Sequence, residues 1–299
     1  MIQSISPSAD SFLAAVNQLQ TQVARAQEEI ASGLRVNTPS DDPSVVSDIL
    51  QINSSLARNT QIGQNLSNVT AEVNGAEGAL SSAVSTLDTV ATLASQASNF
   101  NRTAADRAEA AVEIQDQLQN LIGDANTSVG NRYVFSGDAD QTAPYGLDLT
   151  TTNGTTPYAG SAATRQVEDP RGGAFAVSLT AQQIFDAPGA SVFAAVNAVR
   201  VALLANDQAG ITTALANLKT AQDSLNSSLA FYGGVQNQVA DATAATSSIG
   251  LQLTSNLSAV RDADVVSVAS DLTTDQLQLQ AAFSARAKYP ATSLFNFLG

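Results

Sequence analysis

Apolar residues recur in alternating steps of four and three near both ends of this 299-residue chain. This spacing places them on one stripe of an α-helix, and such a stripe is the seam of a coiled coil. The N-terminal stripe contains Phe12, Val16, Leu19, Val23, Ala26 and Ile30. The C-terminal stripe contains Val235, Val239, Ala242, Thr246, Ile249 and Leu253, and it continues with Val265, Val268, Leu272 and Leu279. A seam needs a second helix, from the same chain or from a neighbour, so assembly is the first functional hypothesis.

The composition excludes several functional classes. The chain contains no His and no Cys, which removes His-based acid–base chemistry, the usual nucleophilic triads and most zinc sites. Its net charge of −14, with no basic run, disfavours nucleic acid as a partner. We therefore expect no catalytic residues, no metal site and no cofactor. A secreted enzyme that relies on carboxylates alone is the remote alternative.

The sequence also contains no membrane span, because no stretch approaches about 18 apolar residues. The first ten residues lack the basic region and the cleavage site of a classical signal peptide. Composition alone therefore predicts a cytoplasmic protein. Only 13% of the residues are charged, which suits a surface that packs against copies of itself, although compositional drift explains the same number.

The middle of the chain carries the strongest helical period. A stripe runs through five heptads from Ile62 to Ala97, and a shorter one runs from Ala111 to Ala125 in a helix predicted at 104–126. The helical spacing of apolar residues returns at 192–229. We expect the helices there to pack against the two central stripes. We expect an intramolecular helical bundle here. The terminal stripes lie outside that bundle, so they pack against each other or, in the interpretation we favour, against another chain.

The segment between the helices has a different character. Residues 138–190 hold most of the Pro and much of the Gly, which predicts a small β-rich insertion. Strands are predicted at 131–137, 158–160, 164–168 and 175–179. After the insertion, Phe231-Tyr-Gly-Gly234 is expected to interrupt the helices, which then continue to about Lys288, before Pro290.

These patterns predict a mainly α fold: an elongated helical bundle or coiled coil of N- and C-terminal segments packed together, with the β-rich domain inserted between them. The expected parts are an N-terminal assembly helix and loop (1–43), two halves of a helical core (44–137 and 191–234) around the insertion (138–190), and C-terminal assembly helices (235–299).

A loop rich in Gly and Pro follows the first helix, which is predicted at 8–31. Its end resembles a helix start, with Ser40 or Asp41 as the N-cap, an acidic first turn that includes Asp42, and Pro43 in that turn. A cation site at the two Asp residues is the less favoured alternative. Arg35, in the same loop, either is solvated or pairs with an Asp of the next turn or of a neighbouring subunit.

Two motifs resemble segments of the bacterial flagellin family, and within it the hook-associated protein 3 group. They are Gly33-Leu-Arg-Val-Asn-Thr-Pro-Ser-Asp-Asp-Pro43 and Gly130-Asn-Arg-Tyr-Val-Phe-Ser-Gly137, the latter followed by Thr142-Ala-Pro-Tyr145. Softer matches occur at Tyr158-Ala-Gly160, Arg165-Gln-Val167, Ile184-Phe185, Ala282–Ala287 and Ser293-Leu-Phe295. The resemblance spans nearly the whole chain, in order.

The resemblance implies a structural protein that contributes to motility. Such a chain would leave the cell through the flagellar type III apparatus without a cleavable signal peptide, and an export chaperone is expected. It would then self-associate into a helical tube at the extracellular hook–filament junction, in contact with other axial proteins of the flagellum. The terminal helices would form an inner layer that is ordered on assembly. The expected interface comprises Phe12, Val16, Leu19, Val23, Ile30, Arg35, Val265, Val268, Leu272, Leu279, Phe283, Leu294 and Phe295.

Two alternatives stay open at this stage. In the same class, the chain could be the filament flagellin itself. In a different class, a cytoplasmic coiled-coil signalling protein would explain the heptads and the Ala-rich seams. That second alternative does not explain the β-rich insertion or the loop at 33–43.

Overall fold

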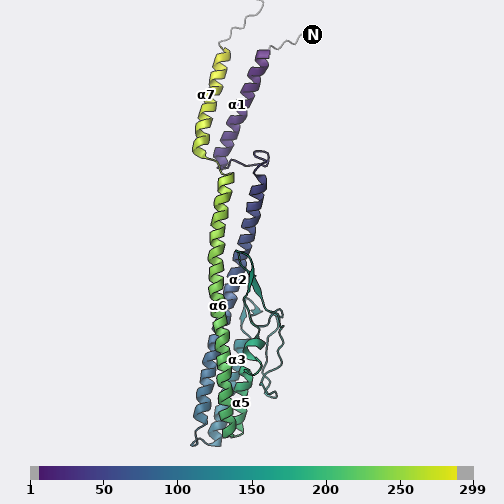
Figure 1. Cartoon of the computed structure of the whole chain (residues 1–299), viewed down its shortest axis with the longest axis vertical. Helices are drawn as coiled ribbons and strands as arrows, with labels where there is room; N and C mark the ends of the chain where they lie inside the picture. Colours follow the sequence, from purple (N-terminus) through teal and green to yellow (C-terminus); the bar gives the residue numbers. More distant parts are fainter. Residues whose placement is uncertain (1–6, 288–299) are drawn as a thin grey trace, which may run out of the picture. The chain divides into compact units, whose positions relative to one another are not determined.

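Long helices make up most of residues 7–287, the part of the chain that the computed structural model describes (Figure 1). In chain order the elements are α1 (Pro7–Ser32), α2 (Val46–Ala97), α3 (Ala104–Ala125), β1 (Ser128–Val129), β2 (Arg132–Tyr133), β3 (Gln166–Glu168), β4 (Ala174–Ala176), α4 (Ala181–Phe185), α5 (Val192–Leu204), α6 (Gln208–Arg261) and α7 (Val265–Ala287). The predicted mainly α fold, with N- and C-terminal helices packed together and a small β-rich insertion, is confirmed.

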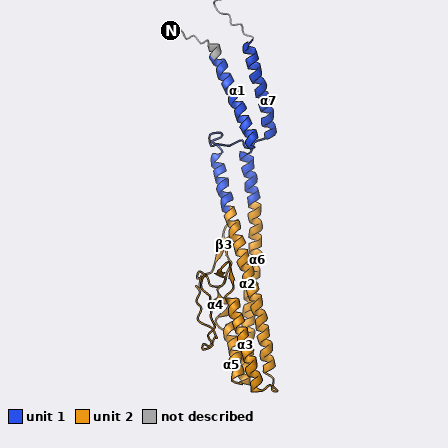
Figure 2. Cartoon of the chain, turned by 180° about the vertical axis from the view of Figure 1, so that it is seen from behind, with its two compact units in different colours: residues 1–58, 250–299 blue, residues 59–249 orange. Residues whose placement is uncertain are grey.

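The chain divides into two compact units (Figure 2). Unit 1 contains residues 1–58 and 250–299, and unit 2 contains residues 59–249. Each of the long helices α2 and α6 contributes residues to both units.

The core of unit 2 forms where the predicted central stripes meet. The α3 stripe from Ala111 to Ala125 is buried, and so is the α2 stripe from Ile62 to Ala97 except for the partly buried Val69. Helix α5 packs along α3, and α6 adds buried residues that include Leu218 and Leu225. Each fully buried Leu, Val or Phe contributes roughly 1.5–3 kcal/mol to folding, so this core dominates the stability of the unit.

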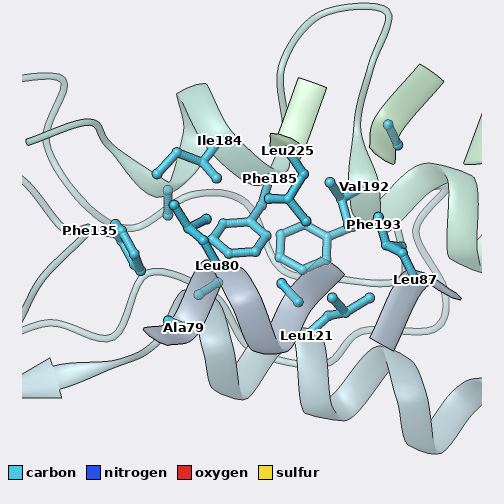
Figure 3. Packing of buried hydrophobic residues seen from close by; sticks show 14 of the residues in the cluster. Ala79, Leu80, Leu87, Leu121, Phe135, Ile184, Phe185, Val192, Phe193 and Leu225 are labelled. Carbon is cyan, nitrogen blue, oxygen red and sulfur yellow. The ribbon is translucent and has the colours of Figure 1, made fainter. Parts of the chain in front are cut away.

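Aromatic side chains join the insertion to the helices. Phe135 meets Phe185 and Tyr232 edge to face, with ring centroids 6.0 and 6.2 Å apart. Phe185 in turn stacks on Phe193 at 5.6 Å, beside Leu80 and Leu121 (Figure 3). Such pairs add to the free energy of burial and orient the rings. They therefore fix the insertion to α2, α3 and α6.

A tight hairpin links the end of α3 to the insertion. Strands β1 and β2 pair antiparallel, and the two residues between them, Gly130 and Asn131, have φ values of 58° and 65°. A two-residue turn with positive φ at both positions favours Gly and Asn, and its twist matches that of paired strands. The predicted strand at 131–137 is therefore shorter than expected, although Val134 and Phe135 beyond it are buried.

Polar contacts also hold the insertion to the helices. Arg165 forms an ion pair with Glu72 of α2 at 2.6 Å, and both side chains are largely buried. The backbone N–H of Leu179 donates to the Tyr232 hydroxyl of α6 at 3.1 Å. Strands β3 and β4, which these contacts flank, pair antiparallel at two of the predicted positions.

The predicted strand at 158–160 is wrong. That segment pairs with no other strand, and the Tyr158 hydroxyl donates instead toward the carbonyls of Phe135 and Ser161, each at 3.0 Å. The side chain of Tyr158 therefore connects two loops, and no strand forms at this position.

The predicted interruption at 231–234 is also wrong, because α6 continues through it without a break. Two glycines cost a helix about 1 kcal/mol each relative to Ala. Tyr232 and Val235 on either side of them are buried in the core, at 0% and 2% exposure. Their burial outweighs the glycine cost.

The first part of the C-terminal stripe has a partner within the chain, contrary to the prediction of a free seam there. Val235, Val239 and Ala242 belong to the same core cluster as Ile62, Leu66 and Val73 of α2. Asn59 also donates to the Thr246 carbonyl at 2.9 Å. Ile249 and Leu253, which are partly exposed at the far end of α6, and the later residues of the stripe in α7 remain candidates for contacts with another chain.

A partly buried carboxyl in α3 makes the stability of unit 2 depend on pH. Burial raises the pKa of Asp124 to about 6, against a smaller opposing effect of a hydrogen bond from Ser82, and its Oδ2 atom is buried with no partner among the described residues. The folded-state pKa exceeds the unfolded value of 3.8, so the stabilising protonated form is lost as pH rises from about 4 to about 6.

We expect Asp124→Asn to raise the free energy of unfolding by about 1 kcal/mol at pH 7, since solvent partly screens the charge of this half-buried carboxylate, and to change it little near pH 3.5. Urea denaturation between pH 3.5 and 7 measures the difference. Asp116→Asn removes the same charge from an exposed position of α3 and serves as the control. A difference between wild type and Asp124→Asn that does not vary with pH contradicts the prediction.

Candidate assembly interface

The two terminal helices, α1 and α7, pack against each other in unit 1. Part of each apolar stripe therefore has its partner within the chain. They run antiparallel: the Arg286 guanidinium near the end of α7 lies 5.6 Å from the ring centroid of Phe12 near the start of α1. Further along, Val23 and Leu279 line the same groove. A cation over an aromatic face contributes roughly 0.5–1 kcal/mol at an exposed site.

This pairing covers the stripes only partly. Among the predicted interface residues of α1, Val16 is buried, at 6% exposure, whereas Phe12, Leu19, Val23 and Ile30 are partly exposed. Helix α7 has no buried residue at all within its bounds. There Val268, Leu272 and Leu279 are partly exposed, and Val265 and Phe283 are 43% and 48% exposed. Leu294 and Phe295 lie outside the described residues.

A groove about 330 Å³ in volume runs between the two helices. Val23, Ala24 and Leu279 give it apolar walls, and four glutamines, Gln20, Gln27, Gln276 and Gln280, give it polar edges. Such a groove, with apolar walls and uncharged edges, is suited to binding a further helix. No charged side chain would lose its hydration when that helix binds.

The loop after α1 binds the end of α6. The backbone N–H groups of Arg35 and Val36 donate to the Arg261 carbonyl at 2.8 and 3.3 Å, and Ala263 N–H donates to the Gly33 carbonyl at 3.0 Å. Leu34 and Asp262 form an isolated antiparallel bridge. The last carbonyls of a helix lack partners within it, so this loop acts as a cap supplied from elsewhere in the chain.

Arg35 connects both sides of this loop. Its guanidinium donates to Asp42 Oδ2 at 2.8 Å and to the Val260 carbonyl at 2.7 Å. Of the two alternatives for Arg35, the structure shows the ion pair with an Asp of the next turn, Asp42. Arg35 also donates a hydrogen bond to a carbonyl at the end of α6. Hydrogen bonds from a charged donor are about twice as strong as neutral ones.

The acidic pair shapes the loop differently from the predicted cap. Helix α2 begins at Val46, so neither Ser40 nor Asp41 is its N-cap. Asp41 instead accepts from the backbone N–H groups of Asn37 and Thr38 at 2.9 and 2.6 Å, and Ser40 pairs with the Thr38 hydroxyl at 2.8 Å. The exposed Pro43 lies in the turn before the helix. The prediction failed because Asp41 satisfies N–H groups upstream of it.

Asp42 occupies the turn that leads into α2. Its Oδ1 accepts from the Ser44 hydroxyl at 2.5 Å and from the Ser44 backbone N–H at 3.3 Å. The Ser44 hydroxyl and then Arg35 lower the pKa of Asp42, and the backbone N–H of Thr38 is the main cause of the lowered pKa of Asp41. Both carboxyls are already engaged by donors, and in residues 7–287 no group of three or more acidic side chains could hold a metal ion.

Replacing Arg35 with alanine should loosen this loop without unfolding unit 2. Loss of two charge-assisted hydrogen bonds should speed hydrogen exchange at the amides of Val36 and Ala263 by about tenfold, which corresponds to 1–2 kcal/mol. Hydrogen–deuterium exchange with mass spectrometry measures this change. Arg25→Ala, which removes the exposed ion pair with Glu29, is the matched control. Equal exchange rates in the two variants would contradict the assigned role of Arg35.

The sequence carried no signal for some residues of this site. The carbonyls of Val260 and Arg261 are backbone groups, which every residue possesses, and Val36 is buried at 6% exposure although no periodic stripe includes it. Within the described part of the chain, no helix is long and apolar enough to cross a membrane.

Comparisons with known proteins agree with this arrangement. Residues 7–140 match the model of the bacterial flagellin N-terminal helical region. The chain is similar to flagellar hook-associated protein 3 of Escherichia coli, with 27% identity over 93% of each chain. Among solved structures it resembles hook-associated protein 3 of Legionella pneumophila, with a TM-score of 0.63 and 18% identity over 71% of this chain and 98% of that one. It also resembles a flagellar hook-associated protein of Vibrio parahaemolyticus, with a TM-score of 0.65 and 20% identity over 74% and 99%.

The likeness to solved structures concerns the fold. The likeness in sequence to the Escherichia coli protein covers nearly the whole chain. The chain is thus similar in sequence to flagellar hook-associated protein 3 and, over residues 7–140, to the N-terminal helical region of bacterial flagellin, and it is similar in fold to solved hook-associated proteins.

Proposed function

We propose that this chain is a structural subunit of the bacterial flagellum that assembles at the hook–filament junction. The observation that carries the proposal is the partial coverage of the terminal helices. Helix α7 presents an apolar stripe without a single buried residue, although α1 packs along it. Copies of unit 1 that pack side by side in a tube would cover these stripes.

Magnitudes support an interface that forms on assembly. Ordering the backbone costs about 1–2 kcal/mol per residue, and a side chain contributes 1.5–3 kcal/mol only when it is fully buried. Among the described residues of unit 1, the buried apolar ones are Val16, Ala26, Val36 and Leu257, far fewer than in unit 2. The balance therefore favours unit 1 only when a neighbour completes the burial. The ends of the free chain should be cut by protease well before its middle.

The same proposal places the chain outside the cell, in contact with other axial proteins of the flagellum. The kinship with flagellar hook-associated protein 3 supports this location. Export through the flagellar apparatus without a cleavable signal peptide, with the help of a chaperone, follows from the proposed role. No enzymatic step is required for it.

Labelling intact cells with an antibody against this chain, followed by electron microscopy, tests the proposal. Label confined to the hook end of the filament is expected. Label along the whole filament would identify the chain as the filament subunit instead, and label found only in the cytosol would favour a signalling coiled coil. Cells that lack the gene provide the control for antibody specificity.

A further inference from the structure

One arginine in unit 2 is buried without the partners that a buried charge needs. Among the described residues two arginines are buried, Arg107 of α3 at 7% exposure and Arg200 of α5 at 9% exposure. An arginine keeps its charge at any ordinary pH, and burying a charge is costly unless hydrogen bonds or an opposite charge compensate it. The two side chains can therefore be compared by the acceptors that surround each of them.

Arg107 shows how this fold satisfies a buried guanidinium. It donates to the carbonyls of Ala97 and Asn99 at 2.9 and 3.3 Å, to the Gln208 side chain at 2.9 Å, and to the Asn206 side chain. Each of its three side-chain nitrogens therefore has an acceptor. The Ala97 carbonyl belongs to the end of α2, where the helix dipole also favours a cation. Arg107 is thus fully used within the chain and needs no ligand.

Arg200 has a single acceptor. Its Nε–H donates to the Asn197 side chain at 2.9 Å, and within residues 7–287 its Nη1 and Nη2 nitrogens make no hydrogen bond or ion pair. Neither is among the fully enclosed side-chain atoms that lack a partner, so both reach the protein surface. Hydrogen bonds, together with the charge of a nearby arginine, lower the pKa of several carboxyls, but Arg200 is the arginine in none of these cases. The described chain therefore supplies no carboxylate for this charge.

A chain of hydrogen bonds fixes the orientation of Arg200. The side-chain amide of Asn197, which is 3% exposed, donates to the carbonyls of Thr151 and Thr152 at 3.3 and 3.0 Å, and its oxygen accepts from Arg200 Nε. Because Nε is occupied, the guanidinium presents its end, where one N–H of Nη1 and one of Nη2 lie side by side. This pair matches the two oxygens of a carboxylate, and a side chain that is already held in place loses little entropy on binding.

A groove beside Asn197 gives room for the rest of a ligand. It is about 790 Å³ in volume and lies between the loop at 149–152 and the helices α5 and α6. Asn197 is part of its wall, and Thr150, Thr152 and Asn217 give it hydroxyl and amide edges. Of the residues in the described part of the chain that line it, only Asp207 is charged. With no second cation in the groove, Arg200 balances one negative charge, which favours a carboxylate over a doubly charged phosphate.

We propose that Arg200 binds the carboxylate of a small organic acid, with the uncharged remainder of the acid in the groove beside Asn197. Nη1 and Nη2 donate to the two carboxylate oxygens, while Asn197 holds Nε and so positions the guanidinium. The inference goes beyond the proposed function, because the site needs one copy of the chain and lies in unit 2, whereas the terminal helices α1 and α7 belong to unit 1.

Titration of the full, nitrogen-15-labelled chain with sodium acetate tests the site by NMR. The signals of Arg200 Nε–H and of the Asn197 side-chain amide should shift and saturate, whereas sodium chloride at the same ionic strength should leave them unchanged. On the Asn197 signal, Arg200→Gln should weaken binding by about tenfold or more. Arg200→Lys keeps the charge but loses the paired donors, so it should weaken binding by about fivefold or more. Arg102→Gln removes an exposed arginine of the same unit and is the matched control.

The identity of the anion and its source are decided in the same titration. Saturable shifts with acetate that disappear in Arg200→Gln and persist in Arg102→Gln support the inference. Shifts that equal those with chloride, or that survive Arg200→Gln, overturn it. Tighter binding of phosphate than of acetate overturns the assignment of a carboxylate. A glutamate peptide with blocked ends that binds about tenfold tighter than acetate overturns the small acid in favour of a carboxylate carried by a protein, and weaker peptide binding supports the free acid.

Stability provides a second readout, which separates a binding role from a structural one. Arg200→Gln removes a buried charge that has one acceptor, so the midpoint of urea denaturation in chloride should stay the same or rise. Arg107→Gln leaves several acceptors unpaired and should lower that midpoint. Acetate should raise the midpoint of the wild type and not that of Arg200→Gln, because a ligand stabilises the state that binds it. If Arg200→Gln lowers the midpoint as much as Arg107→Gln does, Arg200 is structural and the inference is overturned.

Discussion

Replacing Tyr232 with alanine should lower the free energy of unfolding of unit 2 by about 3–5 kcal/mol. Tyr232 is fully buried, its ring meets Phe135 and Phe231, and its hydroxyl accepts the Leu179 N–H. The substitution therefore leaves a cavity where α6 meets the insertion and removes the partner of a backbone N–H. Urea denaturation followed by circular dichroism measures the loss.

Two further variants separate the contributions. Tyr232→Phe keeps the ring and removes only the hydroxyl, so a loss of about 1–3 kcal/mol is expected from the unpaired N–H of Leu179. Phe100→Ala truncates an aromatic side chain that is 92% exposed, and it should change the stability of the monomer by less than about 0.5 kcal/mol. If Tyr232→Ala cost no more than Phe100→Ala, the packing assigned to this part of the core would be wrong.

The variant Val16→Asp should be exported but should fail to enter the flagellum, with incorporation reduced more than tenfold. Val16 is the most buried predicted interface residue of α1. A carboxylate there must either stay unpaired among apolar neighbours, which costs several kcal/mol, or separate α1 from α7. The same replacement repeated in every copy of a tube excludes a stable assembly. Immunoblots of sheared flagella and of the medium, in cells that lack the wild-type gene, measure the distribution.

Because Val16 lies in unit 1, the thermal unfolding of unit 2 should not change in the purified variant. Gln18→Asp introduces the same charge at an exposed position one half-turn away and should enter the flagellum normally. Leu19→Asp should behave like Val16→Asp, with a smaller effect because Leu19 is partly exposed. Normal incorporation of Val16→Asp would show that the terminal stripes are not the assembly surface.

Sequence reasoning succeeded where one physical effect dominates. The stripes at 62–97 and 111–125 are long and regular, so burial decided both the helices and their pairing, and nearly every member is buried. It failed where effects compete over a few residues. At 231–234 the burial of Tyr232 stabilises the helix by more than the two glycines destabilise it. At 158–160 the hydrogen bonds of the Tyr158 hydroxyl, and not pairing with another strand, hold the segment in place.

The loop at 33–45 shows why the candidate site was only partly predictable. The pattern of Ser, Asp and Pro indicated a cap, but Asp41 accepts from N–H groups upstream of it and Asp42 accepts from donors on both sides, and only geometry decides among such partners. The attachment of this loop to the end of α6 uses carbonyls of Val260 and Arg261, more than 200 residues away in sequence, and the hydrogen bond from Arg35 to Val260 spans 225 residues. Every residue has the same backbone groups, so neither the composition nor the spacing of apolar residues indicates which carbonyls accept these hydrogen bonds.

The bond between Asn59 and the Thr246 carbonyl, 187 residues apart, has a consequence for the order of events in folding. The helices of unit 2 close their core with partners from both sides of the insertion, so the chain loses the entropy of a very long loop before most of the burial is gained. In a chain that emerges from its N-terminus, α3 and α5 can pack as soon as about 204 residues are present, but α2 cannot pair with the part of α6 around Thr246 until nearly 250 residues have emerged. The topology therefore makes completion of the core of unit 2 a late event in a chain that emerges from its N-terminus.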